Sequence, residues 1–182
     1  STLFPYTTLF RSVKLEKIIL TACVTLIGGV LLLIVSELFK VLVIVPTQKT
    51  REQIQVVLSQ VVFYSNRLTN FFPPEPTEHE IDIIKSITQD LRKAATDLQS
   101  KYELVYMKKP LALLKILPSQ ERIEVAFTGL IYLHNSILYE GRRDYIVNLI
   151  EMNDNEIERV KAALTGEAIP GKLKPEEQRR FV

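Results

Sequence analysis

The longest apolar segment of the chain is residues 18 to 35, "IILTACVTLIGGVLLLIV", which contains no charged side chain. As an α-helix rising about 1.5 Å per residue it would span roughly 27 Å, close to the thickness of a bilayer's hydrocarbon core. Leu, Ile and Val, which favour insertion into lipid, dominate it. The run predicts a transmembrane helix. A cleaved signal peptide is the alternative, but the run is longer than the usual h-region and no A-x-A site follows it.

Residues 36 to 45, "SELFKVLVIV", predict a helical juxtamembrane extension of this span. Glu37 and Lys40 are three residues apart and can pair on a helix. A strand is the alternative because "VLVIV" is β-branched, but no second strand is evident for it to pair with. Pro46 is predicted to mark the end of this segment, which we take as residues 13 to 45.

Beyond Pro46 the apolar positions repeat with the period of an α-helix. Helices are predicted over residues 47–70, from residue 77 to about 105, and over 123–138. The clearest stripe belongs to the second and opens with a T-x-x-E capping box at Thr77 and Glu80; it consists of Ile81, Ile84, Ile87, Leu91, Ala95, Leu98, Tyr102 and Val105. These amphipathic helices predict one shared core.

Breakers separate the predicted helices. "FFPPEP" at 71–76 contains three prolines, and "KKP" at 108–110 is predicted to interrupt the chain before a short helix or turn at 111–117. Residues 145–150 and then 153–164 are expected to form a short final helical region that ends at Gly166. The predicted fold is therefore all-α, with one N-terminal transmembrane helix, a small helical bundle over residues 46–165 and a flexible tail over 166–182.

Charge and cysteine content exclude several classes of function. The chain carries a net charge of +2, but residues 46–182 contain 19 basic and 19 acidic side chains. A neutral domain is not expected to bind nucleic acid. Cys23 is the single cysteine, so neither a disulfide framework nor a thiolate metal cluster is predicted.

No pattern typical of a catalytic, metal or cofactor site is present. His79 and His134 are the two histidines, and they are far apart in sequence. No G-x-S-x-G elbow, Walker A motif or G-x-G-x-x-G loop occurs. We therefore predict that the protein is not an enzyme and has no metal or cofactor.

Two polar segments inside apolar helices predict a possible binding groove. "YSNRLTN" covers residues 64–70, and "LIYLHNSILYEGRRDY" covers 130–145. Asn is unfavourable inside a helix, so a buried one needs hydrogen-bond partners. A satisfied hydrogen-bond network in the core is the alternative interpretation. If the two segments face each other, the residues of the groove are Tyr64, Asn66, His134, Asn135, Arg142 and Arg143.

Two resemblances bear on these expectations. Residues 2–12, "TLFPYTTLFRS", resemble the translation of a widely used short-read sequencing adapter, so we treat residues 1–12 as an artefact and expect the true N-terminus to be missing. A natural tail with a turn at Pro5 is the alternative. Residues 18–165 resemble uncharacterised single-pass prokaryotic membrane proteins with a helical domain. That resemblance implies no activity and no functional residue.

The sequence thus predicts a membrane-anchored helical interaction module that binds a protein partner, or self-associates, at the lipid bilayer. The alternative is a membrane-tethered sensory or small-ligand-binding bundle. An enclosed, polar-lined cavity in the domain would favour this alternative. Lys40, Lys49 and Arg51 after the span outnumber Lys14 and Lys17 before it, which favours a cytoplasmic location of the domain at the cell membrane.

Overall fold

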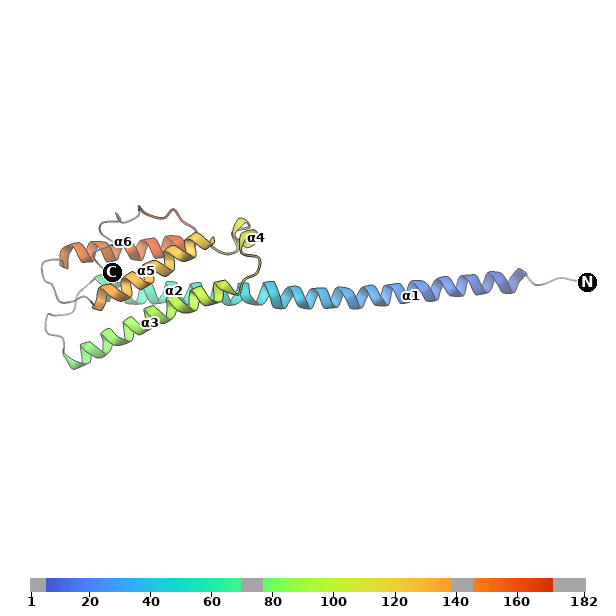
Figure 1. Ribbon diagram of the computed structural model, residues 1–182, viewed down its shortest axis with the longest axis horizontal. Helices are drawn as coiled ribbons and strands as arrows, with labels where there is room; N and C mark the ends of the chain where they lie inside the picture. Colours follow the sequence, from blue (N-terminus) through green and yellow to red (C-terminus); the bar gives the residue numbers. More distant parts are fainter. Residues whose placement is uncertain (1–5, 70–76, 139–145, 172–182) are drawn as a thin grey trace, which may run out of the picture. The chain divides into compact units, whose positions relative to one another are not determined.

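A computed structural model describes the backbone of residues 6–69, 77–138 and 146–171, and the side chains of 16–68, 77–137 and 150–171. These residues form helices and no strand, which confirms the all-α prediction. The elements in chain order are α1 (Tyr6–Phe39), the π-helix η1 (Lys40–Ile44), α2 (Val45–Thr69), α3 (Glu78–Glu103), α4 (Lys108–Leu113), α5 (Gln120–Leu138) and α6 (Ile146–Thr165) (Figure 1). The chain divides into an N-terminal unit, Ser1–Ile44, and a C-terminal unit, Val45–Val182.

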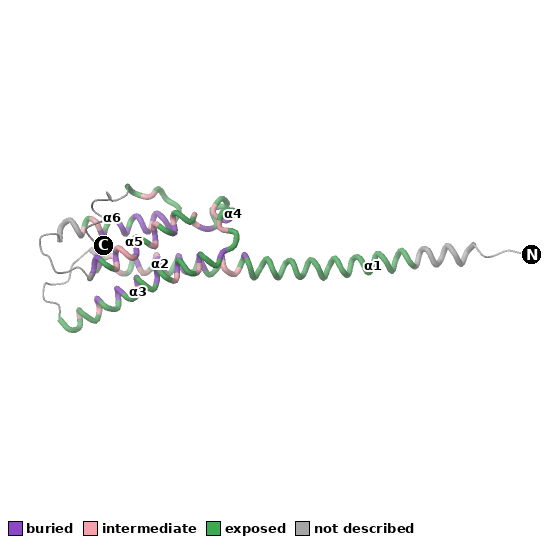
Figure 2. Tube along the Cα trace, viewed as in Figure 1, coloured by how far each residue is buried: buried purple, intermediate pink, exposed green. Residues whose placement is uncertain are grey.

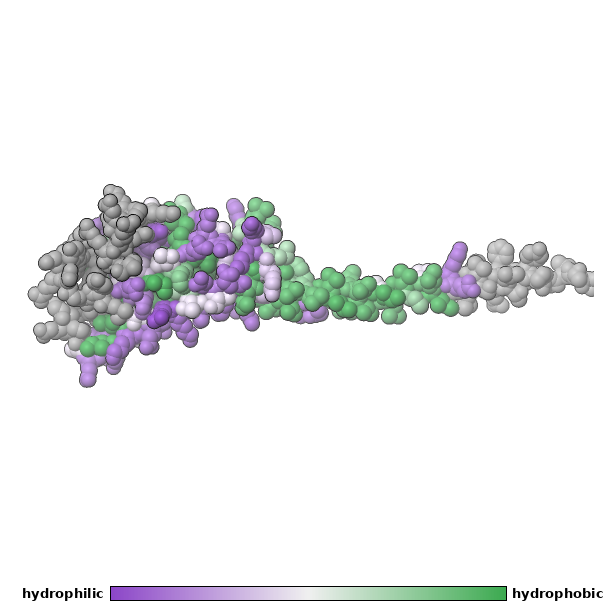
Figure 3. Space-filling view, in the orientation of Figure 1, coloured by the Kyte–Doolittle hydropathy of each residue, from purple (hydrophilic) through white to green (hydrophobic). Residues whose placement is uncertain are grey.

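In the N-terminal unit, the apolar run of α1 is unburied. The large aliphatic side chains between Ile18 and Val35 are 50% to 73% exposed (Figures 2 and 3). The hydroxyls of Thr21 and Thr25 donate to the carbonyls of Lys17 and Thr21, so these polar groups are satisfied within the helix. Among the described residues there is one helix, near the N-terminus, that is long and apolar enough to cross a membrane.

Helical structure continues through Pro46, although the chain divides into its two units within two residues of it. Pro46 is the second residue of α2, directly after the π-helical residues Lys40–Ile44. Proline has no N–H to donate to the preceding turn, and its ring crowds the carbonyl four residues earlier. The π turn directly before Pro46 is a local adjustment of the kind that accommodates a proline without breaking the helix.

Four helices of the C-terminal unit pack in a ring: α2 against α3 and α6, and α5 against α3 and α6 (Figure 1). Their lengths of 19 to 26 residues confirm the prediction of at least three further helices longer than ten residues. The clearest predicted apolar stripe lies on α3, and its side chains are buried as expected. Ile84, Ile87, Leu91 and Leu98 are 9%, 2%, 0% and 0% exposed. Ile81 is the exception and is 37% exposed in the first turn.

The start of α3 has the predicted capping box. The Thr77 hydroxyl accepts from the backbone N–H of Glu80, and the Glu80 carboxylate accepts from the backbone N–H of Thr77 at 2.8 Å. Two donors that the helix leaves unpaired are thereby satisfied. The backbone N–H and the hydroxyl of Thr77 both donate to the Glu80 carboxylate, and these two bonds lower the pKa of Glu80 because they stabilise its ionised form.

One of the predicted breaks is helical in the structure. "KKP" forms the first turn of α4, where Pro110 needs no intrahelical donor. The predicted final helical region, 145–150 and 153–164, is one continuous helix, α6, in which Asn153 turns its side chain into the core. Gly166 ends α6 with φ +89°, and its N–H donates to the carbonyl of Ala162.

Candidate functional site

Two residues of the predicted groove are bonded to α3. The Tyr64 hydroxyl, on α2, donates to the Asp90 carboxylate at 2.6 Å. That hydrogen bond, with smaller contributions from burial and from the negative charge of Asp90, raises the pKa of Tyr64 to about 12. His134, on α5, has Nδ1 2.9 Å from the Thr88 carbonyl oxygen. Each side chain therefore reaches α3 from a different neighbouring helix.

The other four predicted groove residues divide into two groups. Asn66 and Asn135 are exposed on α2 and α5. Arg142 and Arg143 lie outside the described residues. A common groove that contains all six stays a prediction.

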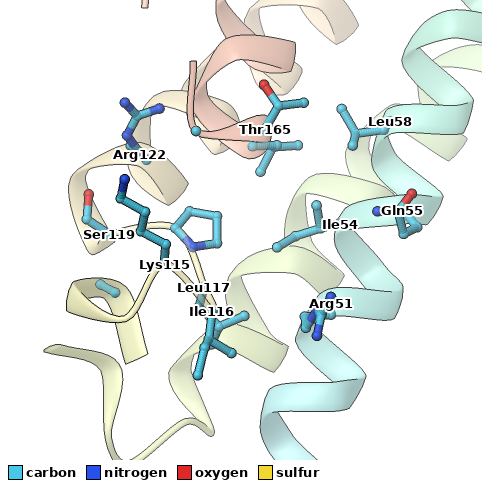
Figure 4. Close-up of a pocket in the computed structure, with 14 residues that line it drawn as sticks. Arg51, Ile54, Gln55, Leu58, Lys115, Ile116, Leu117, Ser119, Arg122 and Thr165 are labelled. Atoms are coloured by element: carbon cyan, nitrogen blue, oxygen red, sulfur yellow. The ribbon is translucent and has the colours of Figure 1, made fainter. Parts of the chain in front are cut away.

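A pocket of about 610 Å³ lies elsewhere in the C-terminal unit (Figure 4). Residues of α2 form one wall, and the segment from α4 to the start of α5 forms the other, with the end of α6 beside it. The lining combines positive charge with aliphatic surface and contains no carboxylate. It consists of Arg51, Ile54, Gln55, Leu58, Ala112, Lys115, Ile116, Leu117, Pro118, Ser119, Arg122, Leu164, Thr165 and Gly166.

Three cationic side chains, Arg51, Lys115 and Arg122, border this pocket. Arg122 is held in place because its Nη1 donates to the carbonyls of Ala162 and Glu167, both at 2.9 Å. A cation beside the carboxyl end of α6 is electrostatically favourable. Arg51 is exposed on α2. Guanidinium and ammonium groups beside aliphatic side chains suit a ligand that has one anionic and one apolar part.

Lys115 reaches the pocket through an uncommon backbone conformation. Its φ is +56°, in the left-handed region. Its N–H donates to the carbonyl of Ala112, and the next N–H, that of Ile116, donates to the carbonyl of Leu111. This pair of bonds is the Schellman arrangement that ends a helix, and its left-handed position is usually Gly. A lysine there costs free energy, which makes the position notable beside a pocket.

A buried ion pair on α6 escaped sequence analysis. Arg159 Nη1 donates to Glu156 Oε2 at 2.6 Å, and the side chains are 7% and 4% exposed. Burial raises the pKa of Glu156, and the charge and hydrogen bond of Arg159 oppose that rise without cancelling it. Nearby on α6, Asn153 donates to the carbonyl of Leu68 at 2.7 Å, at the end of α2. The E-x-x-R spacing of Glu156 and Arg159 could have indicated the pair, but nothing in the local sequence indicates that it is buried.

Within the described ranges, no group of three or more His, Cys, Asp or Glu side chains is placed to hold a metal ion. No family model, no curated protein and no solved structure matches this chain. Inference about function therefore depends on the unburied apolar run, the ring of helices and the basic pocket.

Proposed function

We propose that the chain is a single-pass membrane protein whose C-terminal unit is a small helical bundle that binds a protein partner, or a second copy, at the membrane. The observation that carries this proposal is the unburied run from Ile18 to Val35. So much contiguous aliphatic surface is unfavourable in water, at about 25 cal/mol per Å². In a bilayer the same aliphatic surface faces lipid and is stable. The α-helix can lie there because its backbone hydrogen bonds are satisfied within the helix itself.

The bundle offers a surface for a protein partner on the outside of α2. Val56, Val62 and Phe63 are 43%, 59% and 78% exposed there. Scattered apolar side chains are normal on a surface, but an aromatic ring this exposed is typical of interface residues. The role that we propose is binding without catalysis. We place the span in the cell membrane and the C-terminal unit on its cytoplasmic side.

Photo-crosslinking in intact cells tests this role. A photoreactive amino acid at Phe63 of the full chain is expected to give an adduct in the membrane fraction, at twice the chain's mass for self-association or at another mass for a partner. The same amino acid at Lys93, exposed on α3, is the matched control. Equal labelling at both positions, or a chain that washes out of membranes at alkaline pH, contradicts the proposal.

A second candidate function, binding of a small ligand, is favoured by the basic pocket. Hexyl phosphate and hexanol share an apolar tail and differ in charge, so they separate the two properties of the pocket. Hexyl phosphate is expected to raise the thermal midpoint of the full chain in detergent, and Arg51→Gln to abolish that rise. If hexanol has the same effect, or if the variant responds as the wild type does, the pocket is not an anion site.

A further inference from the structure

The segment between α3 and α5 exposes a high density of apolar side chains. We define the α4 segment as residues 104–116. Leu113 is 84% exposed, Tyr106 77% and Leu114 68%, and Leu104, Met107 and Ile116 add to the same surface. Exposed apolar side chains gathered in one segment are typical of a surface that contacts another protein or a membrane.

Lysines accompany these apolar side chains. Lys109 and Lys115 are exposed, whereas Lys108 is paired with Glu103 and lies 5.2 Å from the centre of the Tyr102 ring. Residues 104–116 contain no acidic side chain. Exposed Leu, Tyr and Met next to lysine are the composition of peptide surfaces that bind at the boundary between lipid headgroups and acyl chains, where lysine meets phosphate.

Hydrogen bonds fix which end of the C-terminal unit carries the α4 segment. The Thr50 hydroxyl, near the start of α2, donates to the carbonyl of Lys101 at 3.1 Å. Lys101 Nζ in turn donates to Gln53 Oε1 at 2.6 Å. The end of α3, from which the α4 segment departs, is therefore attached to the start of α2.

The start of α2 cannot lie far from the apolar part of the chain. Ser36, Glu37 and Lys40 follow Val35, but large apolar side chains recur as far as Ile44, which is 40% exposed. Six further residues lead to Thr50, a distance of about 9 Å along a helix. If the run crosses a bilayer, the chain itself keeps this end of the C-terminal unit near the headgroups.

We propose that the α4 segment is a second membrane contact, which inserts Leu113, Leu114 and Tyr106 into the headgroup boundary of a leaflet that contains anionic lipid. This inference rests on the proposed membrane anchor. The bundle is then held to the membrane at two places, the end of the span and the α4 segment. Lys109 and Lys115 bind lipid phosphates, so the contact weakens as salt screens charge.

Fluorescence in reconstituted vesicles tests the contact. The full chain with Cys23→Ala and Leu113→Cys is labelled with an environment-sensitive dye and reconstituted in phosphatidylcholine with about a quarter phosphatidylglycerol. Lipids that carry a quencher just below the headgroup are expected to reduce its emission by about half. Asp82→Cys, at the opposite end of α3, is the matched control and is expected to be unaffected.

A dye on Cys23 of the wild-type chain reports whether the apolar run of α1 lies in the bilayer. It therefore tests the membrane anchor separately from the α4 contact. Quenching of Cys23 from the bilayer centre, together with no quenching at Leu113, overturns the α4 contact and leaves the anchor intact. Failure of the wild type to float with vesicles overturns both. A dye at Leu113 that is shielded from iodide in water but not quenched from lipid shows that protein, including a second copy, covers the segment, and this also overturns the contact.

Charge is tested by Lys109→Gln combined with Lys115→Gln. Quenching at Leu113 is expected to lose its dependence on phosphatidylglycerol and on salt. Lys85→Gln combined with Lys93→Gln removes two exposed lysines from α3 and is expected to leave both dependences unchanged. Equal behaviour of the two pairs contradicts a role for lysine in the α4 segment.

Discussion

Gly129 of α5 lies directly against Glu156 of α6. A Cβ atom added at Gly129 would stand 2.7 Å from Glu156 Oε1 and 2.5 Å from Val160 Cγ2, both closer than van der Waals contact allows. Because residue 129 has no side chain, α5 can pack closely against α6 at the buried ion pair of Glu156 and Arg159.

Gly129→Ala is expected to destabilise the protein. Overpacking a close contact typically costs about 1–3 kcal/mol, which exceeds the roughly 1 kcal/mol that alanine gains over glycine in a helix. The thermal midpoint of the full chain in detergent, followed by circular dichroism, measures the effect. Thr128→Ala, at the exposed neighbouring position, is expected to leave the midpoint nearly unchanged. A midpoint for Gly129→Ala at or above that of the wild type contradicts the close packing.

The buried Glu156 predicts a defined pH dependence. Its pKa is raised in the folded state above the usual 4.5, so the folded state binds a proton more tightly than the unfolded state does. The stability contributed by this group is complete below the unfolded pKa and is lost as the pH rises through the folded pKa. Glu156→Gln does not titrate, so its free energy of unfolding relative to wild type should rise between pH 4.5 and neutral pH. If the difference in free energy of unfolding between Glu156→Gln and wild type is constant over this range, the pKa of Glu156 is not raised in the folded state.

Leu91→Ala is expected to lower the free energy of unfolding by about 2–5 kcal/mol, because the side chain is fully buried between helices. Ile81→Ala is the matched control, since Ile81 belongs to the same stripe of α3 but is 37% exposed. Denaturant titration of the full chain compares the two. Equal losses mean that α3 does not pack as described.

Lys115→Gly is expected to stabilise the chain by about 0.5–1 kcal/mol, because glycine adopts a positive φ without strain. Lys115→Ala removes the ammonium group but keeps the strained backbone, so it should give no gain. Thermal midpoints of the three proteins separate the two effects. A gain for both variants assigns the cost to the charge of Lys115 and not to its backbone.

Local periodicity was sufficient to predict α3. Its stripe, its capping box and the burial of Leu91 and Leu98 all follow from residues within a few turns of one another. The final helical region was also predicted from local pattern and corresponds to α6. The hydrogen bond that Asn153 makes within it could not be predicted, because its partner, the carbonyl of Leu68, is 85 residues away in sequence.

The pocket could not be predicted for a related reason. Arg51, Lys115 and Arg122 come from three parts of the chain that only tertiary packing brings together. The left-handed Lys115 occupies a position where sequence rules expect glycine, so nothing local marks the end of α4. Tyr64 and His134 were predicted as residues of a groove, but their hydrogen-bond partners on α3 could not be predicted, because those partners carry no recognisable spacing in the sequence.

The bond between Asn153 and Leu68 also sets an order of events during synthesis. With 85 residues between the partners, a ribosome working at about 5–20 residues per second needs roughly 4 to 17 seconds to make the second after the first. Throughout that interval the Leu68 carbonyl lacks its Asn153 donor, and the face of α2 that packs against α6 is uncovered. The nascent chain therefore exposes apolar surface until α6 emerges, and a chain cut short within α6 should be degraded by proteases faster than one that contains the whole of α6.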